Sequence, residues 1–473
     1  MTPQETVERA LAAARCDDCM VIVDEESSAN LRWAGNTLTT NGVIRERQLT
    51  VIAFSRGADG TRVGVVSRAA PRDDQIPDIV LAAEKAATES TPAEDSRPLL
   101  RPGDPEVFGG NAAAGGEVPA WDAPAATTGI SVFSRFAPEL GAAFDEAATA
   151  GRKLYGYAEH SMTSTFVGSS SGLRLRHDQP AGKVDLNAKP ADLSHSAWAG
   201  QGTRDFTDVD VPAMSADLAR RLDWARRQVD LPAGRYETLL SPSAMADLFI
   251  MFYFATRAKD ALDGRTVFSR PGGGTRVGEQ LSALPLTLRS DPWAPGIQCA
   301  PFMVAHASSR LFSVFDNGLA LHPTAWMRDG ELAALLQTRH TAELSGLPVT
   351  PMIGNLILEG PTAGPGGLDD LIARTTRGLL VTSLWYIREV DPQTQLLTGL
   401  TRDGVYLVED GEIVGAVNNF RFNESPVAML GRLTEVGDSV PALAREWSEY
   451  FKRVRMPPAR VEGFNMSSVS EAS

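Results

Sequence analysis

Six histidines are the residues whose spacing could build a catalytic metal site. They are His160, His177, His195, His306, His322 and His340. Catalytic zinc often takes two imidazoles from one helical turn, because positions i and i+4 lie on the same helix face. No two of these histidines lie within five residues of each other. A site of three remote histidines with Cys299 or a carboxylate stays open, but the pattern favours ordinary surface or loop roles.

The cysteines offer a second possible metal or redox site. Cys16 and Cys19 form a C-x-x-C pair, which could be half of a zinc knuckle or a redox pair. A structural zinc site needs four ligands, and no second C-x-x-C or H-x-x-x-H is present to complete it. We therefore predict neither role. An odd set of three cysteines is typical of a chain kept in a reducing compartment, so we expect a cytoplasmic protein.

Two glycine-containing segments resemble catalytic motifs. Residues 168–172 (GSSSG) satisfy the G-x-S-x-G pattern, but a nucleophile elbow needs a helix after the serine. The alternating residues that follow predict a second strand instead, so Ser170 is expected in a hairpin turn and not as a nucleophile. Residues 270–275 (RPGGGT) lack the Gly-Lys-Ser/Thr ending of a phosphate-binding loop and predict a flexible turn.

Composition excludes several classes of partner. The chain has 473 residues and a formal net charge of −14, which argues against nucleic acid or an anionic membrane as the main partner. No run of about 18 uncharged apolar residues is present, and the first residues lack the pattern of a signal peptide. We expect a soluble protein with neither a signal peptide nor a membrane span.

The first half of the chain predicts an α+β domain with an antiparallel sheet, over residues 1–230. Apolar helical spacing predicts helices at 3–15, 77–90, 137–150 and 215–229. Short alternating or apolar runs predict strands at 20–24, 31–40, 48–56 and 61–67 and a hairpin of 154–166 with 172–177. Residues 91–126, rich in Pro, Gly and Ala, predict an irregular insertion.

The second half, residues 231–473, predicts a strand-rich domain with a barrel or sandwich-like form. Apolar or alternating runs predict strands at 236–240, 284–288, 311–314, 379–387, 404–408 and 412–422. Helical stretches at 243–261 and 368–375 interrupt them. So many short strands are typical of a barrel or a sandwich.

Several segments together resemble the TldD/PmbA family, and the resemblance extends along nearly the whole chain. The segments are 235–242 (RYETLLSP), 284–296 (LPLTLRSDPWAPG), 354–360 (GNLILEG), 378–381 (GLLV), 404–417 (GVYLVEDGEIVGAV) and 457–463 (PPARVEG). The Ser-rich turn at 169–173 and the strand, turn and Ala-rich helix at 61–90 are similar to the N-terminal part of the family.

The resemblance implies a zinc motif that this chain has lost. Catalytic members of the family bind zinc through H-E-x-x-x-H on the helix after the start of the C-terminal domain, and through a cysteine near the C-terminus. Here Ile250, Met251 and Ala255 occupy the three motif positions, and no cysteine follows Cys299. Zinc needs N, S or O donors, so no metal ligand and no catalytic residue is expected in this chain.

The loss of all three groups is similar to the TldE/PmbA subunit of the family. That likeness implies a heteromer with a TldD-like subunit that holds the zinc, around a chamber that admits a peptide or small amide substrate. One alternative is a dedicated pair for natural product biosynthesis, an amide hydrolase or leader-peptide maturase; another is a binding or scaffold protein without a peptidase partner. Arg257, Lys259, Asp291 and Trp293 are predicted to face the substrate.

Overall fold

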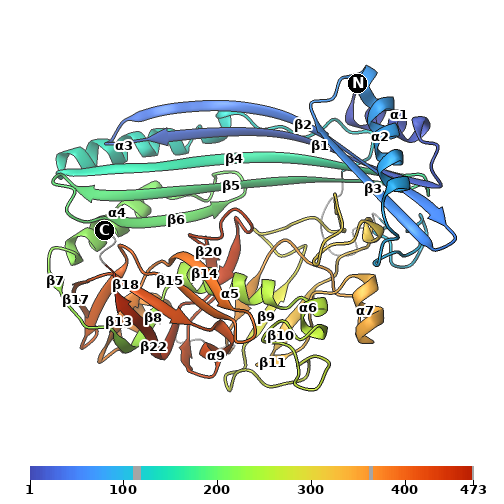
Figure 1. The fold of residues 1–473 in the computed structure, drawn as a ribbon. Coiled ribbons are helices and arrows are strands. Elements are labelled where there is room, and N and C mark those ends of the chain that lie inside the picture. The colour runs from blue at the N-terminus through green and yellow to red at the C-terminus, as the bar shows by residue number, and fades with distance from the viewer. Residues whose placement is uncertain (110–118, 362–365, 471–473) are drawn as a thin grey trace.

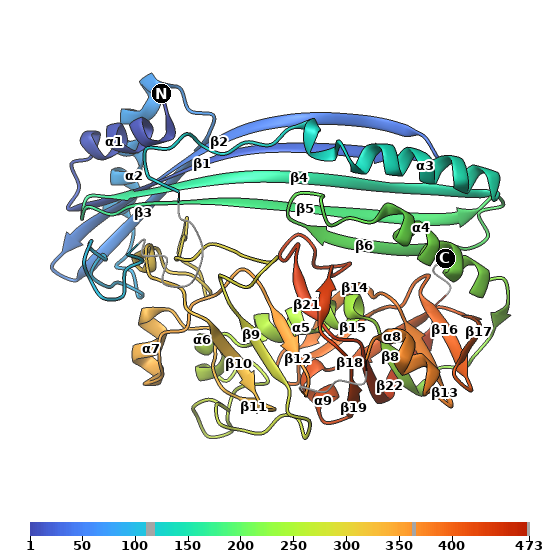
Figure 2. The same ribbon diagram turned by 180° about the vertical axis from the view of Figure 1, so that it is seen from behind.

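The computed structural model describes residues 1–109, 119–361 and 366–470, and it combines one long antiparallel sheet with a strand-rich second half. Figures 1 and 2 show the long sheet arching over the second half of the chain, with the two termini at opposite ends. The α+β prediction is confirmed. In the described part of the chain no helix is long and apolar enough to cross a membrane.

The long sheet has the strand order β3-β2-β1-β4-β5-β6. Its strands are β1 (Asp18–Trp33), β2 (Leu38–Gly57), β3 (Gly60–Ala69), β4 (Arg152–Ser169), β5 (Arg174–Pro190) and β6 (Ala197–Thr203). Most predicted strands were too short, because polar residues follow the apolar part of the strand. Such residues interrupt an apolar pattern without interrupting the backbone ladder. The strand predicted at 31–40 was wrong, because it runs through the turn between β1 and β2.

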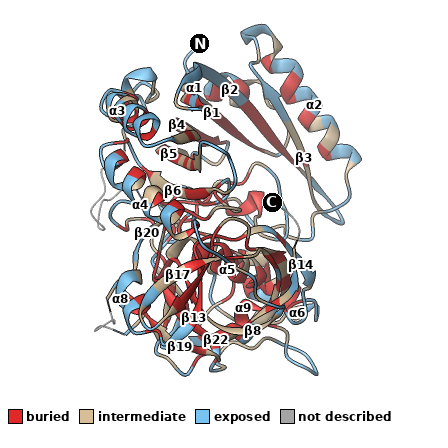
Figure 3. Ribbon diagram, turned by 90° about the vertical axis from the view of Figure 1, so that its left-hand side faces the viewer, coloured by how far each residue is buried: buried red, intermediate tan, exposed pale blue. Residues whose placement is uncertain are grey.

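Four helices cover the outer face of this sheet. They are α1 (Pro3–Ala13), α2 (Ile76–Glu89), α3 (Phe136–Thr149) and α4 (Val211–Trp224). Thr2 begins α1 with a capping box to Glu5. The helices α2 and α3 bury one side against the sheet and expose the other (Figure 3). The sheet therefore has one face covered by helices and one face turned toward the second half.

The second half contains two open sheets and no closed barrel among the described residues. The first has the order β14-β15-β18-β22-β8-β13-β16-β17-β7, with β19 beside β22, and the second β11-β10-β9-β12-β21-β20. The strand-rich prediction is confirmed, and of its two forms the closed barrel is absent from these ranges. Each order is linear with two edge strands, which is the feature that a closed barrel lacks.

The strands of the first of these sheets are β7 (Gln228–Val229), β8 (Gly234–Leu240), β13 (Arg377–Val381), β14 (Trp385–Asp391), β15 (Leu396–Leu400), β16 (Val405–Glu409), β17 (Glu412–Val417), β18 (Phe420–Glu424), β19 (Leu433–Val436) and β22 (Ala459–Val469). The second contains β9 (Thr287–Ser290), β10 (Thr324–Arg328), β11 (Glu331–Leu332), β12 (Ile357–Glu359), β20 (Val440–Ala442) and β21 (Val454–Met456).

The helices of the second half are α5 (Pro242–Ala255), α6 (Ala258–Leu262), α7 (Arg339–Ser345), α8 (Leu368–Ala373) and α9 (Pro426–Leu430). Ser241 starts α5 by accepting the N–H of Ala244, and Pro242 occupies a position that needs no donor. Nearly every residue of α5 is buried. This helix is therefore the centre of the largest apolar core of the protein.

Some predicted elements were wrong in extent or type. The helix predicted over 215–229 ends at Trp224, because Gln228 and Val229 pair with β17. The strand predicted at 311–314 is absent, and a 3-10 turn, η3 (Val314–Asp316), begins there. Pairing with a remote strand overrides local helix propensity.

The predicted hairpin turn is confirmed. The GSSSG segment lies in the turn between β4 and β5, as the hairpin hypothesis required. The described parts of residues 91–126 contain neither helix nor strand, and the remainder of that predicted insertion lies outside the described residues.

Candidate functional site

Strand β1 has two faces with different surroundings. Val21 and Val23 pack outward against α1 and α2. Met20 and Ile22 point the other way and pack against residues of the second half, including Phe302 and Phe315. Because successive side chains of a strand alternate between faces, Asp24, Glu26 and Ser28 continue this inner row as polar residues.

The strand register carries this polar row across the inner face of the sheet. Glu26 lies opposite Thr163 on β4, and Thr163 lies opposite Gln179 on β5. Asp24, Thr165 and His177 form the next row. The sheet is thus apolar where it rests on the second half and polar where it spans the space beside that contact.

A groove runs along this polar face. Three adjoining cavities of about 470, 600 and 270 Å³ line up beneath the sheet, and Glu26 borders all three. The opposite wall comes from the second half, with Cys299, Met303, Tyr450, Lys452 and Arg453 among its residues. The groove is the principal candidate site, because it combines concave shape with converging charged side chains.

An Asp–His pair joins the two halves of the chain inside the groove. Nε2 of His306 lies 2.7 Å from Oδ2 of Asp24, whose Oδ1 accepts the hydroxyl of Thr165 at 2.5 Å. The carboxylate orients the imidazole, as in many acid–base sites. His177 borders the same cavity, and burial lowers its pKa so that the ring is neutral near pH 7. The Asp24–His306 pair thus presents an oriented imidazole at the wall of this cavity.

Two carboxylates lie side by side at the open border of the groove. Glu26 of β1 is directly opposite Glu46 of β2, and both side chains are exposed. Burial of part of the Glu26 side chain raises its pKa. No hydrogen bond or ion pair joins either carboxylate to another described residue. Like charges in this position are destabilising, so the arrangement favours contact with a cationic group.

The other end of the groove is built by the segment that follows β20. Lys452 forms an ion pair with Glu159 of β4 at 2.9 Å, and Lys183 of β5 donates to Glu449 at 2.7 Å. Burial opposes ionisation of Glu159, but the ammonium of Lys452 lowers its pKa overall. These pairs attach residues 449–453 to the underside of the sheet.

Asp247 of α5 anchors the same segment from below. Its carboxylate accepts the backbone N–H groups of Glu446 at 3.0 Å, and of Trp447 and Arg445 at 3.2 Å each. Asp247 is fully buried, and burial raises its pKa to about 8 despite these three donors. The carboxyl group therefore has a positioning role and does not touch the groove.

Cys299 borders the groove but is a weak nucleophile. Its side chain is 8% exposed, and burial raises the pKa of the thiol to about 12. The thiol is therefore protonated at neutral pH, whereas nucleophilic attack and metal binding need the thiolate. No described group of three or more His, Cys, Asp or Glu side chains is arranged to hold a metal ion. Among the six histidines, the structure brings His177 and His306 to one cavity.

The three motif positions on α5 do not fit zinc. Ile250 is fully buried, Ala255 is 5% exposed and Met251 packs against the same apolar core. None supplies the nitrogen or oxygen donors that this site would need, and burial among apolar side chains leaves no room for hydrated metal. The predicted loss of chemistry at Ile250, Met251 and Ala255 thus coincides with a helix that serves as core.

The four residues predicted to face the substrate lie outside the groove lining. Arg257 pairs with the buried Asp260 at 2.6 Å, and Lys259 pairs with Asp263 at 2.7 Å beside a separate cavity of about 420 Å³. Asp291 accepts the N–H of Trp293 at 2.9 Å in the loop after β9. Contact of these four residues with a substrate stays a prediction.

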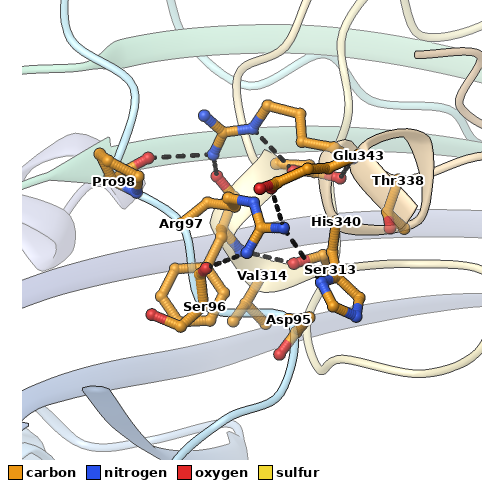
Figure 4. A network of polar contacts seen from close by, with 12 residues as sticks. Asp95, Ser96, Arg97, Pro98, Ser313, Val314, Thr338, His340 and Glu343 are labelled. Carbon is orange, nitrogen blue, oxygen red and sulfur yellow. Dashed lines mark hydrogen bonds and ion pairs between the residues drawn. The ribbon is translucent and has the colours of Figure 1, made fainter. Parts of the chain in front are cut away.

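A polar network next to that separate cavity ties residues 95–98 to the second half (Figure 4). Arg97 contacts Nδ1 of His340 at 3.1 Å and forms an ion pair with Glu343. Arg339 donates to the carbonyl of Pro98 at 3.0 Å and to the carboxylate of Asp316 at 2.9 Å. Burial raises the pKa of Asp316, and the guanidinium of Arg339 opposes that shift.

Comparisons with known proteins agree with this architecture. The family model of the PmbA/TldA metallopeptidase C-terminal domain matches residues 233–468. The chain is similar in structure to TldE from Thermococcus kodakarensis, with 16% identity, a TM-score of 0.76 and coverage of 98% of this chain and 99% of that chain. A search of curated proteins finds no match.

Two further solved structures share the fold. A protein of Thermotoga maritima, described as a candidate modulator of a DNA gyrase, has 16% identity and a TM-score of 0.75, over 98% of this chain and 99% of its own. A similarly described protein of Bacteroides thetaiotaomicron has 15% identity and a TM-score of 0.73, over 99% and 98%. The fold is thus that of a metallopeptidase-like class with an N-terminal long sheet. The chain belongs to the TldD/PmbA family.

The groove residues were missed by sequence reasoning. Asp24 is the last residue of the strand predicted at 20–24, Glu26 lies beyond the predicted end, and His306 lies in a loop without a motif. Their signal in the sequence is the polar alternation that follows Met20 and Ile22. Only the sheet register and the loop of the second half bring these groups together.

Proposed function

We propose that this chain is the non-catalytic, TldE-like subunit of a heteromeric zinc metallopeptidase. In this proposal a TldD-like subunit holds the zinc, and this chain supplies the wall of the substrate chamber through its groove. The observation that carries the proposal is the state of α5. Ile250, Met251 and Ala255 replace the motif residues and are packed as core, so the water activation that zinc provides must come from another chain.

The groove supports a role in holding substrate. Its charged rows and its Asp–His pair suit an extended peptide or small amide, whose polar backbone needs hydrogen-bond partners in place of water. Residues 449–453, attached by Lys183 and Lys452, set the width of one end. The groove therefore contributes orientation and exclusion of water, and the bond is broken at the partner's metal.

Metal analysis tests whether the partner subunit, and not this chain, holds the zinc. The purified chain is expected to contain far less than one zinc ion per molecule, measured by plasma mass spectrometry after dialysis. A complex with a TldD-type subunit that carries H-E-x-x-x-H is expected to contain one zinc per pair. Stoichiometric zinc in the isolated chain, or failure of the two chains to associate, would overturn the proposal.

Activity assays address the substrate. The reconstituted pair is compared on unfolded casein, on leader peptides and on small N-acylated amino acids. Cleavage of casein is the expected result for a general peptidase. Turnover of small amides with no cleavage of casein would assign the pair to a dedicated biosynthetic step.

A further inference from the structure

Among the described residues, no strand pairs with one edge of the long sheet over half the length of β2. Strand β3 pairs with residues 48–57 of β2, whereas residues 38–47 of β2 pair with β1 alone. Figures 1 and 2 both show β2 as the upper rim of the sheet, with β3 at one end. We call residues 38–47 the open edge.

The main-chain groups of the open edge point away from the sheet at alternate residues. Ala70 donates its N–H to the carbonyl of Arg47 at 2.7 Å, so Arg47 directs its main-chain groups away from β1. In an antiparallel ladder this direction repeats every second residue, which places the N–H and C=O of Asn41, Val43 and Arg45 on the same side. No described residue hydrogen-bonds to these groups.

The side chains of the open edge are exposed on both faces. Val43 lies opposite Ala29 and therefore belongs to the outer face, whereas Ile44 lies opposite Ser28 on the inner face. They are 48% and 50% exposed, and Leu38 near the turn is 46% exposed. Unpaired apolar edges are aggregation hazards that soluble proteins normally cover or charge.

The other edge of the sheet is covered by the chain itself. Strand β6 contacts α4 and β20, and Gly202 lies so close to the carbonyl of Lys452 that a Cβ there would be 1.9 Å from it. The β2 side is thus the edge of this sheet that is open to another molecule over a long stretch.

The open edge is continuous with the groove. Ile44 and Glu46 border the smallest of its three cavities, and Arg45, Glu46 and Arg47 border the largest. A strand added antiparallel to β2 extends the same sheet, and two sheets joined in this way turn their inner faces to the same side. Docking here would therefore place the incoming subunit's inner face beside this groove.

We propose that the open edge of β2 is the docking site for an edge strand of the TldD-like partner, which pairs with it antiparallel. This inference rests on the proposed function. A free peptide would satisfy the main-chain groups but leave Val43 and Ile44 exposed on opposite faces. The sheet of a partner subunit, with residues packed on both of its faces, can bury both side chains.

Replacing Val43 by proline tests main-chain pairing directly. No described residue of this chain accepts the N–H of Val43, and proline is tolerated where an edge strand faces solvent. The variant Val43→Pro should therefore fold but lack one ladder bond and present a ring to the incoming strand. Val43→Thr is the matched control, because it keeps the N–H and the β-branched shape.

The readout is the dissociation constant for a TldD-type subunit that carries H-E-x-x-x-H, measured by calorimetry or sedimentation. Wild type and Val43→Thr should bind alike, and Val43→Pro at least about tenfold more weakly, which corresponds to about 1.4 kcal/mol. Equal binding of Val43→Pro overturns this inference and leaves the proposed function intact. Absence of binding by the wild-type chain overturns the proposed function itself.

Two further measurements keep the test decisive. Hydrogen exchange of the wild-type chain should be fast at the amides of Asn41, Val43 and Arg45, and slow in the complex, even if Val43→Pro fails to fold. Unchanged exchange at these amides on complex formation overturns the inference. A wild-type chain that is dimeric alone and becomes monomeric as Val43→Pro overturns it in favour of a second copy as occupant.

Discussion

The two halves of strand β2 lie in the same sheet but in opposite environments. Residues 49–54 are buried on both faces, between α2 and the aromatic contact with the second half. Residues 38–46 are exposed on both faces, apart from the half-buried Gly42. Residues 49–54 of β2, the packed half, form part of the hydrophobic core of this chain, whereas residues 38–46, the open half, contribute little to it. The length of the open half points to a surface that another molecule covers.

The inner faces of the two halves differ in the same way. Near the packed half the inner row is apolar, and Phe54 meets Phe315 of the second half with ring centroids 5.1 Å apart. Beside the open half the inner row is polar and borders the groove. The inner face of the sheet therefore has apolar contacts with the second half at one end and polar groove residues at the other.

The largest expected effect comes from the ion pair that supports the packed end. Arg339→Ala leaves the carboxylate of Asp316, which is 1% exposed, without its cation. Breaking a buried pair in this way costs about 3–5 kcal/mol of unfolding free energy. Guanidinium denaturation followed by fluorescence measures the loss. A variant of Arg97, whose partner Glu343 is exposed, serves as control and should lose much less.

The second largest effect is expected from a mutation that creates a cavity in the packed half of β2. Ile52 is fully buried on the inner face, and Ile52→Ala should lower the unfolding free energy by about 2–5 kcal/mol, because it removes contacts with the aromatic cluster. The shift of the denaturation midpoint reports the loss. A loss of unfolding free energy below about 1 kcal/mol would show that the contacts of the packed half contribute little to the stability of the sheet.

The third effect is a dependence of stability on pH through Asp247. Its pKa is raised to about 8 in the folded chain, so the folded state takes up a proton that the unfolded state releases near its ordinary value of 3.8. Stability should therefore fall as pH rises from about 4 to about 8. Asp247→Asn should flatten this slope, measured as denaturation midpoints at several pH values. Asp145→Asn, at an exposed site on α3, should leave the slope unchanged.

The smallest effect is expected in the open half of β2. Ile44 lies on the same strand and inner face as Ile52 but is 50% exposed. Ile44→Ala should change the unfolding free energy of the isolated chain by no more than about 0.5 kcal/mol. The same denaturation experiment measures it. A loss as large as that of Ile52→Ala would remove the contrast between the two halves.

The sequence predicted local features wherever one segment carries its own signal. The helices α2 and α3, the turn between β4 and β5 and the start of α5 at Ser241 and Pro242 follow from periodicity and capping. The length of β1 was underestimated because Asp24, Glu26 and Ser28 on its inner face are polar, although the strand continues to Trp33. The helix predicted over 215–229 was too long, because Gln228 and Val229 pair with β17 and do not continue the helix.

The candidate site also has a part that the sequence predicted and a part that only the tertiary structure shows. The assignment of Ile250, Met251 and Ala255 to the motif positions rests on the resemblance and stays a prediction. The absence of H-E-x-x-x-H is read directly from the sequence, and zinc needs nitrogen, oxygen or thiolate ligands in any fold. The sequence by itself thus determined the absence of that motif, the acidic charge and the type of most elements. Only the tertiary structure decided that Asp24 meets His306, that Lys452 reaches Glu159 and that residues 38–47 of β2 pair with β1 alone among the described strands. These are contacts between segments far apart in the chain, and their register depends on packing that no local pattern encodes.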